Sequence, residues 1–169
     1  IAGGEPFTRT DLLDILTSFP KLVFPIFTNG MLLDNKLILR LKKMPQVIPV
    51  LSLEGEATAT DCRRGNGVYE KLKDVMNELK KANIFFGLSQ TLMRDNFETV
   101  INRQSVKEWI RKGCSLFFFI EYVPASEGTG HLTLTTEQRK KVLPLTDKLR
   151  SDLNAVFLAF PGDEADFGG

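Results

Sequence analysis

The feature that most constrains the fold of this chain is an alternation of short apolar runs with longer amphipathic segments. Five runs are almost continuous in apolar residues, as expected of strands buried on both faces: 22–27, 47–53, 84–88, 116–123 and 155–160. Strand and helix alternating at about 30 residues per unit is the pattern of a parallel sheet or barrel. The sequence therefore predicts an α/β fold with a parallel sheet.

Amphipathic segments between these runs predict helices at residues 9–18, 35–43, 69–81 and 100–112, and from Thr136 onward. Thr135, with Gln138 three residues later, forms the sequence pattern of a capping box, and Pro144 predicts a kink or a break in the last helix. Asp34 is the candidate cap of the second helix, and Thr8 or Thr10 that of the first.

Two prolines, Pro25 and Pro49, lie inside proposed strands. Proline cannot donate a hydrogen bond to a strand ladder. We expect both residues at bulges or at early strand positions.

Composition excludes several classes of protein. The chain has 169 residues, enough for one domain with a core, and 43% of them are hydrophobic. Its net charge of +1 gives no attraction to nucleic acid or to an anionic membrane. No apolar run approaches the ~18 residues of a membrane helix. Cys62 and Cys114 form no disulfide framework and no signal peptide precedes them, so a cytoplasmic protein is expected.

Polar residues follow the predicted strands, where ligands bind in parallel α/β folds. Thr28-Asn29-Gly30 follows the first strand, Ser52 and Glu54 the second, Ser89-Gln90-Thr91 the third, and Tyr122 lies at the end of the fourth. Loops of a purely structural domain are also polar, so this pattern alone leaves both interpretations open.

Two loop segments carry more specific chemistry. In Gly3-Gly4-Glu5-Pro6, the glycines let a ligand approach backbone carbonyls, and Glu5 adds a carboxylate suited to an ammonium group. A simple turn is the alternative. In the run from Asp61 to Gly67, arginines and glycines precede a helix and could hold an anion; a solvated capping loop is the alternative.

In this order and spacing, Gly-Gly-Glu-Pro, Thr-Asn-Gly, Ser-Leu-Glu-Gly and Asp-x-x-Arg-Gly-x-Gly-x-Tyr resemble the radical S-adenosylmethionine (SAM) enzymes. The resemblance is greatest to members with a cysteine-rich C-terminal extension. It covers residues 3–124, and the tail 160–169 looks like the lead-in to that extension.

The resemblance implies a SAM site. Its parts are an amino-group loop at Gly3, Gly4 and Glu5; a ribose and carboxylate contact at Ser52; and a carboxylate contact at Arg64 or the adjacent Arg63. Thr28 and Asn29 would line the cavity mouth, and Ser89 and Thr91 would contact SAM or the substrate. Tyr122 and Val123 would contact the adenine. Glu54 stands where related sequences often have Asp.

The family also needs a [4Fe–4S] cluster held by Cys-x-x-x-Cys-x-x-Cys, because these clusters take thiolate ligands. This chain contains no such triplet, and we assign no metal ligand, His131 included. In the family the triplet precedes the Gly-Gly-Glu loop. We therefore expect residues 1–169 to be an internal fragment of one barrel core: a partial (β/α)6 barrel that lacks its first two strands and the cluster.

The resemblance implies that the intact protein is an oxidoreductase. It would cleave SAM reductively to a 5′-deoxyadenosyl radical, which abstracts hydrogen from a small-molecule or peptide substrate of unknown identity. The fragment itself would be inactive.

The alternative is a non-catalytic α/β module that binds a small anionic or zwitterionic metabolite. The codons upstream of Ile1 discriminate between the two, since only the first requires the cysteine triplet. A hydrolytic barrel is disfavoured, because one histidine offers neither a metal site nor a catalytic triad.

Loss of two strands would also leave the strand at 22–27 with an open edge. An apolar parallel edge strand has unpaired N–H and C=O groups that favour pairing with another chain. We expect a second copy of the chain or a rearranged end segment to cover it.

Overall fold

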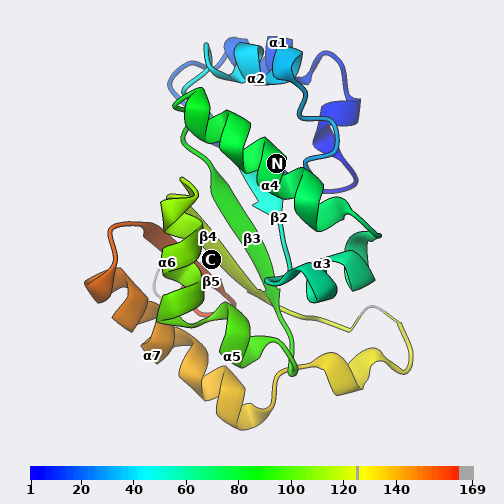
Figure 1. Cartoon of the computed structure of the whole chain (residues 1–169), viewed down its shortest axis with the longest axis vertical. Coiled ribbons are helices and arrows are strands. Elements are labelled where there is room, and N and C mark those ends of the chain that lie inside the picture. The colour runs from blue at the N-terminus through cyan, green and yellow to red at the C-terminus, as the bar shows by residue number, and fades with distance from the viewer. Residues whose placement is uncertain (125, 164–169) are drawn as a thin grey trace.

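The computed structural model describes residues 1–124 and 126–163, and its centre is a five-stranded parallel sheet (Figure 1). The strands lie side by side in chain order: β1 (Phe24–Thr28), β2 (Val47–Ser52), β3 (Gly87–Leu92), β4 (Leu116–Glu121) and β5 (Val156–Phe160). Every neighbouring pair is parallel. The predicted α/β fold and its five strands are therefore confirmed. The expected lead-in at the C-terminus lies largely at 164–169, outside the described residues.

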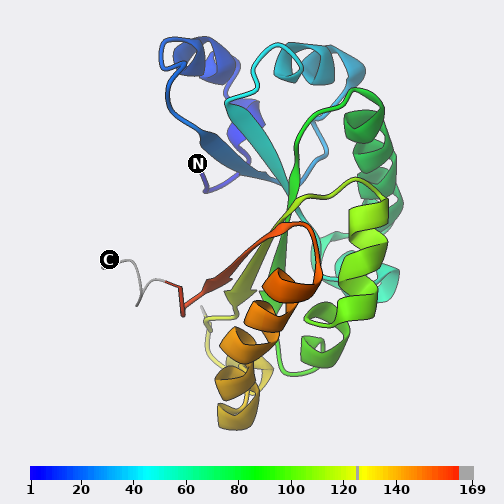
Figure 2. The same cartoon turned by 90° about the vertical axis from the view of Figure 1, so that its left-hand side faces the viewer.

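The main helices cover one face of this sheet (Figure 2). The connecting elements are η1 (Pro6–Thr8), α1 (Leu12–Thr17), α2 (Asn35–Leu41), α3 (Ala57–Arg64), α4 (Val68–Lys81), α5 (Phe97–Val100), α6 (Arg103–Arg111), η2 (Thr129–Leu132) and α7 (Thr136–Asp152). In the described part of the chain, none of these helices has the length and apolarity needed to cross a membrane.

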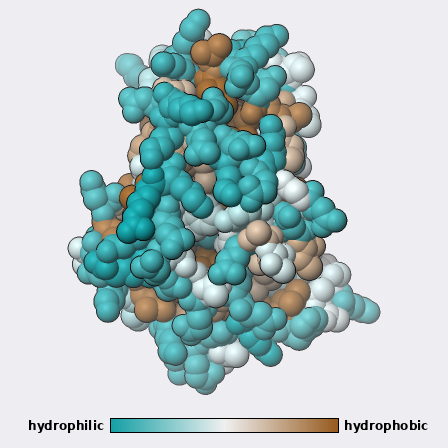
Figure 3. Space-filling model, viewed as in Figure 1, coloured by the Kyte–Doolittle hydropathy of each residue, from teal (hydrophilic) through white to brown (hydrophobic). Residues whose placement is uncertain are grey.

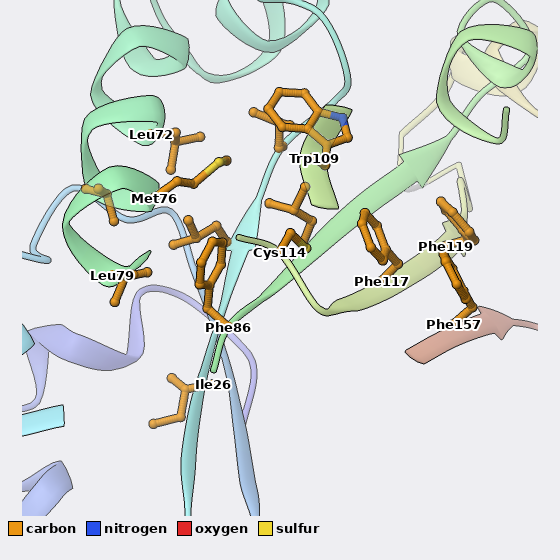
Figure 4. Close-up of a cluster of buried hydrophobic side chains, with 14 of the residues drawn as sticks. Ile26, Leu72, Met76, Leu79, Phe86, Trp109, Cys114, Phe117, Phe119 and Phe157 are labelled. Atoms are coloured by element: carbon orange, nitrogen blue, oxygen red, sulfur yellow. The ribbon is translucent and has the colours of Figure 1, made fainter. Parts of the chain in front are cut away.

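The larger core lies between the sheet and these helices (Figure 4). Phe117 stacks on Phe157 with ring centroids 5.1 Å apart, and on Phe119 at 6.3 Å. From the helix layer, Leu72 and Met76 of α4 are completely buried against the same cluster. Alternation along each strand accounts for this face, because side chains two residues apart point the same way.

The opposite face of the sheet carries a second, smaller cluster that consists of strand residues alone. Its buried members are Val50, Leu116 and Phe118, with Phe27, Ile48, Ile120, Leu158 and Phe160 half-buried around them. Phe27 meets Phe118 edge to face, with ring centroids 4.9 Å apart. No helix of the described residues contributes to this cluster (Figure 2). We call this side of the sheet the open face.

The two strand prolines occupy positions that cost no ladder hydrogen bond. Pro25 is the second residue of β1, the edge strand, as expected from the missing N–H. Pairing of β2 with β3 begins at Val50, one residue after Pro49. The predicted early strand position is confirmed for Pro25, whereas Pro49 is the third residue of β2 and precedes only the pairing with β3.

Several predicted boundaries and caps were wrong. β3 begins at Gly87, not at residue 84, because the chain at Ile84 still ends α4: its N–H donates to the carbonyl of Leu79. α1 begins after Asp11 rather than after Thr8 or Thr10. Of the kink or break predicted at Pro144, the break does not occur, because α7 continues through this residue. The capping box of Thr135 and Gln138 and the Asp34 cap are confirmed, the latter accepting from Leu37 N at 2.8 Å.

The sequence did not predict α3 and α5. The run from Asp61 to Gly67 is not a loop that precedes a helix: its first half ends α3, and Gly67 is the N-cap of α4. The Asp61 carboxylate accepts from Gly67 N at 3.0 Å and from Tyr69 N at 2.8 Å. The N-terminus of α4 is thus capped by a carboxylate of the chain itself, at the place where the sequence left open an external anion or a capping loop.

Ile1 lies against the outer edge of β1. Its amino group donates to the carbonyl of Pro25 at 2.6 Å, and its carbonyl accepts from Phe27 N at 2.9 Å. These are the hydrogen bonds of a parallel bridge centred on Ile26. A residue from the start of the chain therefore pairs with part of the edge that we expected an end segment or a second copy to cover.

Candidate functional site

The Glu5 carboxylate joins the N-terminal loop to the carboxyl end of β1. One oxygen accepts from the Thr28 hydroxyl at 2.8 Å and from Phe7 N at 3.2 Å, and the other accepts from Asn29 N at 2.8 Å. Thr28 is almost completely buried, and its hydroxyl also accepts from Gly30 N. Glu5, Thr28 and Asn29 therefore form one unit, although the sequence separates them by more than twenty residues. A carboxylate has about four acceptor positions, so the Asn29-bound oxygen retains room for a further donor.

The two glycines before Glu5 are exposed and have left-handed backbone angles, φ +102° at Gly3 and +55° at Gly4. No atom lies within 4 Å of where a Cβ would stand on either. Their backbone is therefore open to a ligand. A side chain at Gly3 would strain the loop even though there is space for it.

Three of the predicted hydroxyl residues lie together on the open face, near the carboxyl ends of β2 and β3. Ser52 and Ser89 are register partners on neighbouring strands, and Ser52 follows the open-face residue Val50 by two positions. Thr91 is two residues beyond Ser89 on the same face, level with Ile120. Thr28, level with Leu51, belongs to the helix-covered face instead.

Glu54 is completely buried and binds two arginines of α3. Arg63 Nη1 donates to Oε2 at 3.0 Å, while Arg64 Nε donates to Oε1 at 2.9 Å. The backbone N–H of Glu54 donates to the Thr60 hydroxyl at 3.2 Å. Thr60, Arg63 and Arg64 share one face of α3 through their spacing of three and four residues. Both arginines that bind the Glu54 carboxylate therefore belong to α3.

A cavity of about 610 Å³ opens beyond the carboxyl ends of β3 and β4. Its wall comes from α3 and its N-cap residue, from the β3–α5 connection, from α5, from Tyr122 and from η2. The lining side chains are those of Glu56, Thr58, Ala59, Cys62, Arg63, Met93, Asp95, Asn96, Thr99, Tyr122 and Leu132. Figure 3 shows a few apolar residues at the surface in the lower half of the molecule, the half in which Figure 1 labels α3 and α5. This volume is in the range of small-molecule sites.

Tyr122 connects the cavity to the arginine cluster, because the guanidinium of Arg63 lies 5.8 Å from the centre of its ring. Of the two arginines that the sequence left unresolved, Arg63 lines the cavity and Arg64 does not. Val123 is 74% exposed and is not among the cavity residues.

Most cavity residues were not predicted. Asp95 and Asn96 escaped notice because the sequence ended the third strand at residue 88, whereas β3 continues to Leu92 and its loop begins later. Asn96 holds that loop: its amide oxygen accepts from Met93 N at 2.7 Å, and its NH₂ group donates to the carbonyl of Thr91 at 2.9 Å. A correct strand end would have identified both residues.

The polar groups fit SAM but not an iron–sulfur cluster. Carboxylate, guanidinium and hydroxyl groups lie at the strand ends, and they complement an ammonium, a carboxylate and a ribose. Within the described residues, no three His, Cys, Asp or Glu side chains gather as a metal site. Both cysteines are free: Cys62 is exposed, and Cys114 is buried, with its pKa raised by burial to about 12.

No protein-family model matches this sequence, and no curated protein resembles it. Solved structures do. SuiB of Streptococcus suis, bound to S-adenosylmethionine, matches 93% of the chain with TM-score 0.73 and 19% identity. Native anSMEcpe with bound AdoMet matches 99% with TM-score 0.70 and 17% identity. Both are radical SAM enzymes. The chain therefore has the radical SAM fold.

A domain of a pyruvate-formate lyase-activating enzyme from Bacteroides vulgatus has the same fold, with TM-score 0.55 and 12% identity over 93% of this chain and 96% of that domain. The chain spans only 38% of SuiB and 51% of anSMEcpe. The radical SAM fold agrees with the family that the motifs indicated and with a barrel-like parallel sheet.

Proposed function

We propose that this chain forms the SAM-binding part of a radical SAM oxidoreductase. The observation that carries the proposal is the radical SAM fold with complementary polar groups at the carboxyl ends of its strands. In open α/β sheets this edge is where ligands bind.

In this proposal the Gly3-Gly4-Glu5 loop binds the amino group of SAM. The exposed glycine backbone offers carbonyl acceptors, and Glu5 is held in place by Thr28 and Asn29 rather than left mobile. A carboxylate fixed by three donors loses little side-chain entropy when an ammonium group binds it. Thr28 and Asn29 therefore orient the clamp.

Other residues would bind the remaining parts of SAM. Ser52 would contact the ribose and the carboxylate, and Ser89 and Thr91, on the same open face, would contact SAM or the substrate. Arg63 and Arg64 would receive the carboxylate. Tyr122 and Val123 remain the predicted adenine contacts. All these assignments rest on the motif resemblance together with the placement of the side chains.

A [4Fe–4S] cluster would supply the electron for reductive cleavage of SAM in the intact protein. The described residues have no ligand set for it, so its cysteines would belong to a part of the protein outside this chain. The chain's own role is to bind and orient SAM and to exclude side reactions.

The substrate is proposed to be a small molecule or a peptide that enters by the 610 Å³ cavity. Two neighbours by structure were solved with peptides: SuiB bound to precursor peptide SuiA, and anSMEcpe with AdoMet and the Kp18Cys peptide. The cavity supports a peptide side chain as occupant, since apolar walls and a few polar groups suit one.

The test is reductive SAM cleavage by the full-length protein, purified without oxygen. We expect a brown, iron-containing protein that forms 5′-deoxyadenosine when reduced. Gly3→Ala should weaken SAM binding, because it strains the clamp, while Gly130→Ala, at an exposed glycine without a left-handed backbone, is the matched control.

Colourless, iron-free protein that carries an intact Cys-x-x-x-Cys-x-x-Cys motif would contradict the proposal. Absence of that motif from the codons upstream of Ile1 would favour the non-catalytic module that binds a small anionic or zwitterionic metabolite.

A further inference from the structure

Glu54, Arg63 and Arg64 form a cluster whose arrangement is not explained by a direct contact between Glu54 and a ligand. Its carboxylate is completely buried, and both oxygens accept from guanidinium groups. A buried charge is stable only when it is paired and hydrogen-bonded. Glu54, which the motif resemblance placed among the cofactor-binding residues, therefore lies behind the two arginines in this structure.

The cluster keeps an excess of positive charge. Two arginines and one glutamate give a net charge of +2 − 1 = +1. The arginine side chains are 37% and 25% exposed, while Glu54 is inaccessible. The negative charge thus lies beneath α3, whereas both positively charged side chains keep part of their surface exposed.

Glu54 also determines where these guanidinium groups lie. Arg64 donates from both Nε and Nη2 to the same carboxylate oxygen, and Arg63 donates from Nη1 to the other. Such charge-assisted contacts restrict two otherwise long and flexible side chains. Thr60 adds a third link between α3 and the Glu54 backbone.

We propose that Glu54 is a positioning residue that holds Arg63 and Arg64 ready to bind the carboxylate of SAM. The inference rests on the proposed function and deepens it. It also assigns a role to both arginines, since one buried carboxylate orients the pair. A guanidinium fixed in advance loses less entropy on binding than one that is free to rotate.

The test compares two probes in the full-length protein: SAM, and 5′-methylthioadenosine, which lacks the amino-acid carboxylate. Glu54→Gln keeps the size of the side chain but removes its charge. We expect the Kd for SAM to rise about 10-fold, the effect of losing a group that orients a ligand-binding residue. The Kd for 5′-methylthioadenosine should stay unchanged. Glu54→Asp, which restores the carboxylate, should recover part of the SAM affinity.

A double-mutant cycle separates positioning from structural support. If Glu54 acts through the arginines, Glu54→Gln should not weaken SAM binding further in an Arg63→Gln/Arg64→Gln background. Equal loss of both probes, or full additivity in the cycle, would overturn the proposal in favour of a structural role.

Thr60→Val provides a variant that loosens α3 without changing charge, and it serves if Glu54→Gln does not fold. In that case, Glu54→Asp should lower the affinity for SAM but not that for 5′-methylthioadenosine, and Thr60→Val should show no such selective loss. The same effect of both substitutions on the two affinities would overturn the inference. Equal affinity of the wild-type protein for 5′-methylthioadenosine and SAM would also overturn the inference, but it would not contradict the proposal that the protein binds SAM. Failure of the wild type to bind SAM at all would overturn the proposed function as well.

Discussion

At the scale of single residues, buried or half-buried carboxylates organise the carboxyl edge of the sheet. Glu5 ties the N-terminal loop to β1, Asp61 caps α4, and Glu54 fixes the arginines of α3. Each satisfies backbone or guanidinium donors that would otherwise lack partners. The loops around the candidate site are therefore held by charge-assisted hydrogen bonds.

Glu5→Gln should lower both stability and SAM affinity. The amide NH₂ would face the N–H of Asn29, replacing an acceptor with a donor. We expect a loss of about 1–2 kcal/mol in the free energy of unfolding, measured by urea denaturation. Glu127→Gln, at an exposed position, is the control and should change stability little. Equal effects of the two substitutions would contradict the role of Glu5.

The two cysteines should differ sharply in reactivity. Burial raises the pKa of Cys114 to about 12, so its thiolate is scarce at neutral pH, whereas Cys62 is exposed. A Cys62→Ser variant should resist Ellman's reagent when folded and react when denatured. Rapid labelling of the folded variant would show that Cys114 is accessible.

The same pKa shift predicts a pH dependence of stability. Because the folded-state pKa of Cys114 lies above its ordinary value of 9.0, the protonated thiol favours folding at lower pH. That contribution is complete below about pH 9 and is lost as pH rises toward 12. Cys114→Ala should flatten the alkaline fall in the free energy of unfolding between these values.

At the scale of elements, local signals decide where helices begin, and packing decides how firmly they are held. α7 starts with a complete capping box: Thr135 Oγ1 accepts from Gln138 N, and Gln138 Oε1 accepts from Thr135 N. Gln138 also donates to the carbonyl of Arg94, which links α7 to the β3–α5 connection near the cavity.

Thr135→Ala should therefore cost about 1 kcal/mol, the usual effect of losing an N-cap. Thr136→Ala is the matched control, because Thr136 is the exposed first residue of the helix and offers no cap. Thermal unfolding monitored by circular dichroism would compare the two. A larger loss for Thr136→Ala would rule out the capping box as the source of stability.

Packing between α4 and the sheet is tested by two adjacent phenylalanines. Phe86 is completely buried in the main core, whereas Phe85 is 47% exposed. Phe86→Ala should lower the free energy of unfolding by about 3–5 kcal/mol, because it leaves a cavity in a close-packed core. Phe85→Ala should cost far less in the same denaturation experiment. Similar losses would mean that the side chains are not divided between core and surface as described.

At the scale of the whole molecule, the sheet has one face covered by helices and one open face. Among residues 1–124 and 126–163, only Ile1 pairs with the outer edge of β1. Leu22 and Val23, just before β1, are 54% and 64% exposed. Unpaired edge groups beside exposed apolar side chains favour association between chains.

We expect the 169-residue chain to self-associate through this edge. Sedimentation velocity at several concentrations should detect dimers or larger species. Val23→Lys should shift them toward monomer, because a lysine at an edge strand opposes pairing. A lysine at Val123, another exposed valine, is the control. A monodisperse wild-type monomer over the whole concentration range would contradict the prediction.

The architecture was predictable because its signals are local. Apolar runs marked all five strands, helical spacing marked the main helices, and Thr135 with Gln138 marked a cap. The short helices α3 and α5 were missed because neither contains a long apolar stripe; only Thr60 of α3 is buried. Polar residues at the strand ends also located the edge of the sheet where the candidate site lies.

The grouping of those polar residues was decided by tertiary structure alone. Strand register places Ser52 beside Ser89 on the open face, whereas Thr28 lies on the other face and binds Glu5. Burial and charge pairing make Glu54 a partner of α3. The physical reason is that secondary structure follows from neighbours in the chain, whereas register, burial and charge pairing depend on residues brought together from distant parts of it.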